Sequence, residues 1–479
     1  MSVPAHARKD GAAPAPTLGL AQFAASLRGD ALPPDIKSTL GDLLLDYVRV
    51  ASIGAGMPWS AWADAYMADL GGHGRAAVLF RPQRRDAVRA AFLNATYAGS
   101  IDADDTHVGA MLHPGAIVFS AAFALADEVD ASGMNFIAAV AAGYEAMIRI
   151  GLSIQPTHFQ RGFQSTATCG GFGAAVAAAR LAFNGAPAAD HKVASSIGLV
   201  ASFSGGLTQF YKSGSTVKRI HAARAAENGV AAALLARRGF TGPEDILEGA
   251  NGFARAYADA ADFATVTEGL GRDYLLREVT VKGHACSARV QAAVEGILDL
   301  CGQHRLDPDG IADIYVGIPA VILGRLTIPG PIDVQAAQMS LPHSAALAAA
   351  LAPAAEAGFA LSVTDYESSL HEPRVKRLEA LVRCAVDPEV EAATTAESVP
   401  ARVTINMKDG TKHSTFVSAP KGSPSRPFTH DDHVARFRRE LGKRLSARDC
   451  DEIVAIADNL ADLHKIRRLT DLLAITPGP

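Results

Sequence analysis

Between residues 18 and 274 the chain alternates apolar segments of helical period with short turns marked by Gly and Pro. In one such segment Ile137, Val140 and Tyr144 recur at the spacing of one helix face, and Ser132 stands where a helix cap is expected. The same spacing predicts helices over 116–130, 172–183 and 223–238. Their faces consist mostly of Ala and Gly, so this part predicts a body of closely packed helices.

The pattern changes near residue 275. Segments 275–284 and 311–319 are rich in β-branched residues and flank a helix-like segment over 287–304, which predicts a β-α-β unit. A later segment, 401–419, predicts two strands joined at Asp409-Gly410. Helical spacing returns near residue 428. We therefore expect a mainly α protein with an α+β second domain: an all-helical domain of residues 18–274 with 428–479, and a smaller α/β domain of residues 275–427 inserted into it.

Composition narrows the class of protein. The 479 residues include 45 Lys and Arg against 50 Asp and Glu, a net charge of −5, which argues against a broad cationic surface for nucleic acid or membrane lipid. The five cysteines are scattered without CxxC spacing, so we expect neither a disulfide framework nor a zinc site, but a reducing cytoplasm. No secretion signal and no membrane span are predicted.

The first segment that suggests chemistry is 101–115, just before a predicted helix. It places Asp102, Asp104 and Asp105 next to Thr106, with His113 a few residues on. A solvated polar loop is one interpretation, and an acid–base cluster is the other. The two histidines of the segment are six residues apart with no regular element to align them, so metal binding ranks below direct acid–base use.

A second segment carries positive charge. Lys218, Arg219, His221 and Arg224 follow a Gly- and Ser-rich turn and open a predicted helix, an arrangement that binds anions. A solvated helix start is the alternative. Together with the acidic loop in the same helical body, the basic segment favours a small polycarboxylate as the substrate.

The third segment, 161–174, contains Gly171-Phe172-Gly173 before a predicted helix. No strand clearly leads into it and no alternation of strands and helices follows, so it does not predict a dinucleotide site. We expect an enzyme without cofactor or metal.

These segments resemble the MmgE/PrpD family, which includes 2-methylcitrate dehydratase, cis-aconitate decarboxylase and iminodisuccinate epimerase. The similar stretches run in family order from about residue 40 to 445 and include DADDTHVGAMLHPGA, GFQSTATCGGFGAA, GSTVKRIHAARAAENG, SLPHSAALAAAL and KGSPSRPFTHDDHVARFR. The resemblance implies a large helical domain built from both ends of the chain, a smaller α/β lid domain, a homodimer, and a metal-free active site in the cleft between the domains.

The resemblance also implies a set of site residues. The catalytic candidates that it gives are Asp102, Thr106, His113, Lys218 and His221. Three positions depart from the family pattern: Gln164 and Gln291 stand at or near histidine positions, and His343 replaces a tyrosine. A glutamine amide donates hydrogen bonds but does not transfer protons near neutral pH. We add His343 to the catalytic candidates, and the substrate-binding candidates are Gln164, Arg219, Arg224, Lys282 and Gln291.

The chemistry that the resemblance implies is proton transfer at the carbon next to a carboxylate. Lys218, with Arg219 or Arg224, would stabilise the charge that develops, and His113 or Lys218 would be the base. A general acid for a departing hydroxyl would come from His221, His343 or Lys282. The leading hypothesis is a hydro-lyase of a small di- or tricarboxylate. The alternatives are an epimerase of an imino- or amino-dicarboxylate such as iminodisuccinate, a decarboxylase of a cis-aconitate-like acid, and a polycarboxylate-binding protein without activity.

Overall fold

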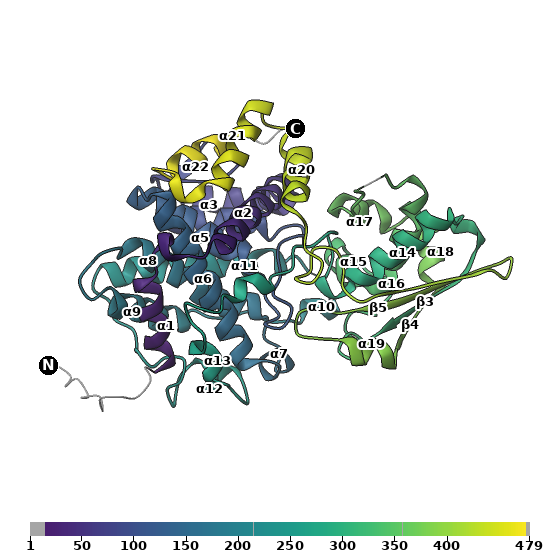
Figure 1. The fold of residues 1–479 in the computed structure, drawn as a ribbon, viewed down its shortest axis with the longest axis horizontal. Helices are drawn as coiled ribbons and strands as arrows, with labels where there is room; N and C mark the ends of the chain where they lie inside the picture. Colours follow the sequence, from purple (N-terminus) through teal and green to yellow (C-terminus); the bar gives the residue numbers. More distant parts are fainter. Residues whose placement is uncertain (1–14, 214, 357, 476–479) are drawn as a thin grey trace.

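The computed structural model describes residues 15–213, 215–356 and 358–475. A helical body and a smaller unit with a β-sheet lie side by side, and the C-terminal helices return to the helical body (Figure 1). The fold is therefore a helical domain plus an α/β domain, as the hydrophobic pattern predicts.

Four long helices form the centre of the helical body: α5 (Gly115–Val129), α6 (Gly133–Ile154), α8 (Ser165–Ala182) and α11 (Lys218–Arg237). Helices α8 and α11 approach so closely that a Cβ atom added to Gly229 of α11 would lie 2.3 Å from the Cβ of Ala174 in α8. Helix α6 is long and apolar enough to cross a membrane, but 94% of its most apolar window is buried inside the protein. Its apolar character is therefore explained by its place in the core.

The other helices surround this centre. From the N-terminal part they are α1 (Pro16–Ser26), α2 (Pro34–Gly54), α3 (Pro58–Asp69), α4 (Ala87–Ala98), α7 (Thr157–Gln160), α9 (Ala189–Ala201), α10 (Phe210–Ser213), α12 (Phe253–Tyr257) and α13 (Ala264–Thr267). The C-terminal ones are α20 (His430–Leu441), α21 (Ala447–Asp458) and α22 (Arg467–Leu473), and a short hairpin joins β1 (Ala76–Ala77) to β2 (Arg84–Arg85). Phe437, Leu441 and Ile453 bury the C-terminal helices in the same core as the N-terminal ones.

The α/β domain contains a four-stranded sheet in the order β4-β3-β5-β6. Strand β3 (Ile311–Ile318) pairs in parallel with β4 (Val382–Val386) and antiparallel with β5 (Ala401–Met407), which continues antiparallel into β6 (Lys412–Val417). The predicted hairpin at Asp409-Gly410 is thus confirmed. The helices of this domain are α14 (Gln291–His304), α15 (Val334–Met339), α16 (Leu341–Leu351), α17 (Val363–Ser369), α18 (Pro373–Glu379) and α19 (Pro388–Ala393).

The strand predicted over 275–284 is wrong. Leu275–Glu278 is a 3-10 turn, and Thr280 forms only an isolated bridge with Thr106 of the helical body. The alternating apolar residues there, Val279 and Val281, pack into the helical core instead of a sheet. The same alternation of apolar residues fits a strand in a sheet and an extended segment that packs on helices, so periodicity alone could not distinguish them. Without this strand the predicted β-α-β unit is not formed.

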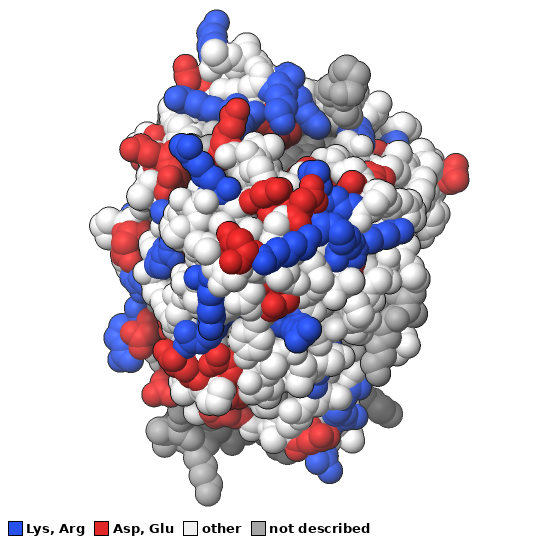
Figure 2. Space-filling view, turned by 90° about the vertical axis from the view of Figure 1, so that its right-hand side faces the viewer, with Lys and Arg blue, Asp and Glu red and all other residues white. Residues whose placement is uncertain are grey.

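The buried apolar side chains form two main clusters. The helical cluster includes Val281, whereas the cluster of the α/β domain includes Cys286 and continues to Val417. The expected domain limits at residues 275 and 427 stay a prediction. Figure 2 shows acidic and basic side chains interspersed over the outer face of the α/β domain, without a field of one sign.

Candidate active site

The acidic loop between α4 and α5 lies where the two domains meet. Its residue Thr106 forms a backbone bridge with Thr280, at the start of the α/β part of the chain. Asp102 adopts a φ of +56°, in the left-handed region that a non-glycine residue rarely occupies. Such a conformation persists only where the surrounding contacts fix it. In this loop the contacts are ion pairs.

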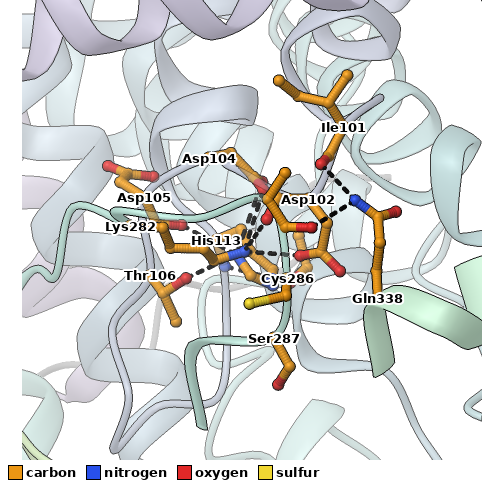
Figure 3. A network of polar contacts seen from close by, with 12 residues as sticks. Ile101, Asp102, Asp104, Asp105, Thr106, His113, Lys282, Cys286, Ser287 and Gln338 are labelled. Atoms are coloured by element: carbon orange, nitrogen blue, oxygen red, sulfur yellow. Dashed lines mark hydrogen bonds and ion pairs between the residues drawn. The ribbon is translucent and has the colours of Figure 1, made fainter. Parts of the chain in front are cut away.

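Asp102 lies between two lysines. Figure 3 shows Lys282 and the acidic loop around Asp102. One carboxylate oxygen is 2.5 Å from the Nζ of Lys218 at the start of α11, and the other is 2.6 Å from the Nζ of Lys282. Lys282 also donates to the carbonyl oxygen of Asp102 and lies 3.5 Å from Asp104. Burial by itself would raise the pKa of Asp102, but the two ammonium groups hold that pKa well below its usual range. The carboxylate is therefore ionised and links both lysines.

His113 has a defined tautomer. Its Nδ1 lies 2.9 Å from the carbonyl oxygen of Asp105 and 2.9 Å from the hydroxyl oxygen of Thr106. A carbonyl oxygen only accepts, so Nδ1 carries the proton and Nε2 carries the lone pair. Among the described residues nothing forms a hydrogen bond with Nε2. Burial, reinforced by Lys282 and Lys218, lowers the pKa of His113 to about 4, so the ring is neutral near pH 7.

A cavity of about 40 Å³ lies next to His113, between the two domains. The helical domain contributes Asp102, Thr106, Val108, Met111, His113, Phe159, Gln164, Ser165, Tyr211 and Lys218, and the α/β domain contributes Ser287, Ala288, Arg289 and Met339. This space is close to that of one water molecule and far below the several hundred Å³ of ordinary ligand sites. We therefore expect the site to widen before a polycarboxylate can enter.

Five of the predicted site residues therefore line one cavity, namely Asp102, Thr106, His113, Gln164 and Lys218. Lys282 is fully buried directly behind Asp102, as the ion pair requires. The carbonyl oxygen of the Gln164 side chain accepts a hydrogen bond from the backbone N–H of Ala167 and caps α8. The fold thus brings the acidic loop and Lys218, the first residue of the basic segment, to the same cavity.

The rest of the basic segment is not brought to the cavity. Among the residues of α11, only Lys218 lines the cavity. Arg219 donates to the side chain of Gln338, and His221 packs against the ring of Phe210. Arg224 is exposed and pairs with Glu227. These three side chains do not line the cavity, and their roles toward a substrate stay a prediction.

His343 and Gln291 are likewise placed elsewhere. The two ring nitrogens of His343 contact Glu379 and Ser369 inside the α/β domain, and the side chain is buried. Gln291 accepts from the backbone N–H of His284 and donates to two backbone carbonyls of the same segment. Both side chains hold the α/β domain together and do not line the cavity, so their roles in catalysis and substrate binding stay a prediction.

Arg289 is the cavity residue that sequence analysis missed. Its guanidinium forms neither a hydrogen bond nor an ion pair within the described part of the chain, and burial lowers its pKa. In the sequence it stands in a segment with helical spacing, where an arginine is ordinarily solvated. Only the fold shows that this segment, just before α14, faces the acidic loop.

No group of three or more His, Cys, Asp or Glu side chains in residues 15–213, 215–356 and 358–475 is placed to hold a metal ion.

Comparison with known proteins adds a family match. Residues 19–266 match the model of the MmgE/PrpD N-terminal domain, and residues 284–462 match that of the MmgE/PrpD C-terminal domain. Similar curated proteins include the cis-aconitate decarboxylase-like protein oryM of Aspergillus oryzae, 26% identical over 96% of this chain and 97% of that protein. The cis-aconitate decarboxylase of Aspergillus terreus is 25% identical over 97% and 96%, and that of Homo sapiens is 24% identical over 80% and 79%.

Proposed function

The chain belongs to the MmgE/PrpD family, and we propose that it is a lyase that removes carbon dioxide from a small tricarboxylate of the cis-aconitate type. The observation that carries this proposal is the free Nε2 of His113, which faces the cavity beside Lys218. Curated relatives along nearly the whole chain are named for the same decarboxylation.

The proposed reaction needs one proton. In a cis-aconitate-like acid the bond between the CH₂ carbon and its carboxylate breaks, and carbon dioxide leaves. The electron pair of that bond forms a new C=C bond to the central carbon. The electrons of the old double bond take up a proton at the carbon next to another carboxylate. His113 is the proposed donor, because its Nε2 is the imidazole nitrogen that faces the cavity.

Substrate binding would make His113 take up the required proton from solvent at Nε2. A tricarboxylate brings negative charge next to the ring, which favours the protonated imidazolium and raises the pKa from its low value in the empty site. Arg289 and Lys218 would bind the carboxylates, since Arg289 has no acidic partner among the described residues and Lys218 shares one with Lys282. The unreacting carboxylates would thereby fix the position of the bond that breaks.

A hydro-lyase is the second candidate, and Lys218 favours it. Elimination of water needs a base for the carbon-bound proton and an acid for the departing hydroxyl. Burial lowers the pKa of Lys218, which makes its ammonium a better acid, while His113 would be the base. An epimerase would need acid–base groups on both faces of one carbon, and it stays the third alternative.

One experiment separates these reactions. The purified protein is incubated in deuterated water with cis-aconitate, citrate, 2-methylcitrate or iminodisuccinate, and the products are followed by NMR and carbon dioxide release. We expect carbon dioxide and one deuterium in the product from cis-aconitate. Conversion of citrate or 2-methylcitrate to an unsaturated acid would favour the hydro-lyase, and deuterium exchange without elimination would favour the epimerase. No turnover of any substrate by the folded protein would overturn the lyase proposal.

A further inference from the structure

A second and much larger recess lies on the other side of the segment that carries Lys282. It consists of two adjoining hollows of about 700 and 450 Å³. Both are bounded by Gly283, by Phe359 and by Arg436 and Arg439 of α20. We call this recess the α20 groove. Unlike the cavity at His113, it has the size of a site for a small organic ligand.

The α20 groove presents hydrogen-bond donors. The backbone N–H of Leu361 donates to Nδ1 of His284, so Nδ1 carries no proton and the neutral ring has its N–H at Nε2. His284 lines the larger hollow, and no hydrogen bond of Nε2 exists among the described residues. Arg436 has one buried guanidinium nitrogen, Nη1, without a hydrogen bond, 3.6 Å from Asp46. Arg439 donates to the carbonyl oxygen of Gly358 and has no acidic partner there.

Three of the five acidic side chains that line the groove, Glu295, Asp432 and Glu440, form ion pairs, whereas Asp299 and Glu356 form none among the described residues. Glu295 accepts from Arg426 and from the backbone N–H of Lys421, and the side chain of Lys421 pairs with Asp432. Glu356 is an exposed acid common to both hollows, and it forms no ion pair among the described residues. Arg439 and the Nε2 of His284 have no acidic partner among the described residues, and these are the donors that an anionic ligand in the groove would meet.

The groove and the active-site cavity share a wall. Gly283 and His284 face the groove, whereas Ser287 and Arg289 face the cavity. Arg436 donates a hydrogen bond of 2.6 Å to the backbone carbonyl of Lys282, whose side chain holds Asp102. A ligand on Arg436 therefore lies one hydrogen bond from the ion-pair cluster of the active site.

We propose that the α20 groove is a second anion site, which binds a small polyanion through its carboxylate or phosphate oxygens and changes substrate binding through the wall formed by residues 282–289. The binding itself needs no turnover, so its failure and a failure of the proposed reaction are separate results.

The binding test uses calorimetry with two non-reacting probes, tricarballylate and pyrophosphate. For the wild type we expect two sites per chain for at least one probe. Arg439→Gln should weaken the groove site about tenfold or more and leave the other site in place. Arg289→Gln should do the reverse. Arg438→Gln is the matched control, because Arg438 is exposed on the same helix and pairs with Asp451 outside the groove. The probe that binds tells a tricarboxylate ligand from a phosphate ligand.

The coupling test measures the KM for the substrate with and without the bound probe. A probe that also enters the active site raises KM by competition in every variant, so the effect of the groove is the further change in KM that we expect in the wild type and in Arg438→Gln and expect to be lost in Arg439→Gln. Lys443→Gln, a second variant of the groove wall, should weaken the effect in the same direction. The proposal is overturned if Arg439→Gln and Lys443→Gln bind both probes with wild-type stoichiometry and affinity, or if filling the groove leaves KM unchanged.

Discussion

Two positive side chains share the single carboxylate of Asp102, so neither is fully neutralised by it. The site has a second carboxylate, Asp104 near Lys282, and a third cation, Arg289 across the cavity. Its three cations outnumber its two carboxylates, so it retains positive charge for the proposed polycarboxylate. Without the carboxylate of Asp102, two buried ammonium groups would lie side by side unpaired. The ion pairs thus offset the cost of the left-handed backbone conformation at this residue.

Lys218 is the residue whose loss should affect catalysis most directly. We expect Lys218→Ala to lower kcat/KM by about 10²- to 10³-fold, as the loss of one positioned charge or donor does in other enzymes. Asp102 keeps its pair with Lys282, so the variant should fold. Arg224→Ala is the control on the same helix, since Arg224 is exposed and pairs with Glu227, and its rate should stay within about twofold. Turnover by Lys218→Ala within a few-fold of wild type would contradict the assigned site.

His113 predicts a pH dependence of stability. In the unfolded chain the imidazole titrates near 6.5, whereas in the folded protein its pKa is lowered to about 4. Between these values the unfolded chain takes up a proton that the folded chain does not, so acid favours unfolding. From pH 6.5 to 4 the free energy of unfolding of the wild type should fall by about 3 kcal/mol relative to His113→Gln. Urea unfolding of both proteins across this range is the measurement. A constant difference would show that His113 titrates normally.

At the scale of residues, the density of acid–base groups indicated the loop that lines the cavity, and the tertiary partners of each side chain were the missing information. Asp102, Thr106 and His113 stand close together in one loop, so the loop itself brings them to the same cavity. Arg219 and His221 are as close to Lys218 in sequence, yet their side chains contact Gln338 and Phe210 instead of the cavity. Arg289 had no distinguishing pattern, because its partner surface is formed by a loop nearly 190 residues earlier.

At the scale of elements, the helices with a strong apolar period and the hairpin at Asp409-Gly410 were predictable, because each buries one face of its own segment. The segment 275–284 was not, since its alternating valines pack against helices. The small strand β4 was missed as well, because its residues are only partly buried and alternate weakly. The secondary structure of such short segments depends on the tertiary contacts that they make.

The contact between α8 and α11 also makes a testable prediction. A methyl group added at Gly229 would lie 2.5 Å from the backbone nitrogen of Ala175, so Gly229→Ala should destabilise the protein by about 1–3 kcal/mol. In contrast, Gly302 of α14 has open space around it, and Gly302→Ala should stabilise its helix by about 0.5–1 kcal/mol. Chemical unfolding of both variants gives the comparison. Equal stability of the two would mean that the helices do not pack as closely as described.

At the scale of the whole molecule, the two domains are held together over the cavity by a clasp of three residues. Gln338 of the α/β domain accepts from Arg219 and donates to the backbone carbonyl of Ile101, which precedes Asp102. The cavity at His113 is too small for the proposed tricarboxylate, so we expect the clasp to open when that substrate enters. Gln338→Ala should favour the open arrangement because it removes both of these bonds between the domains, together with the bond to the backbone carbonyl of Ala285.

Trp59 can report this opening. The guanidinium of Arg219 lies over its indole ring, 4.7 Å from the centroid, so movement of the clasp changes the surroundings of this tryptophan. The chain has two tryptophans, and Trp62→Phe removes the exposed one and leaves Trp59 as the single probe. In this background we expect Gln338→Ala to shift the emission without ligand, and tricarballylate to shift the emission of the intact clasp as it enters. Emission that responds to neither change would show that substrate reaches His113 without separation of the domains at Gln338.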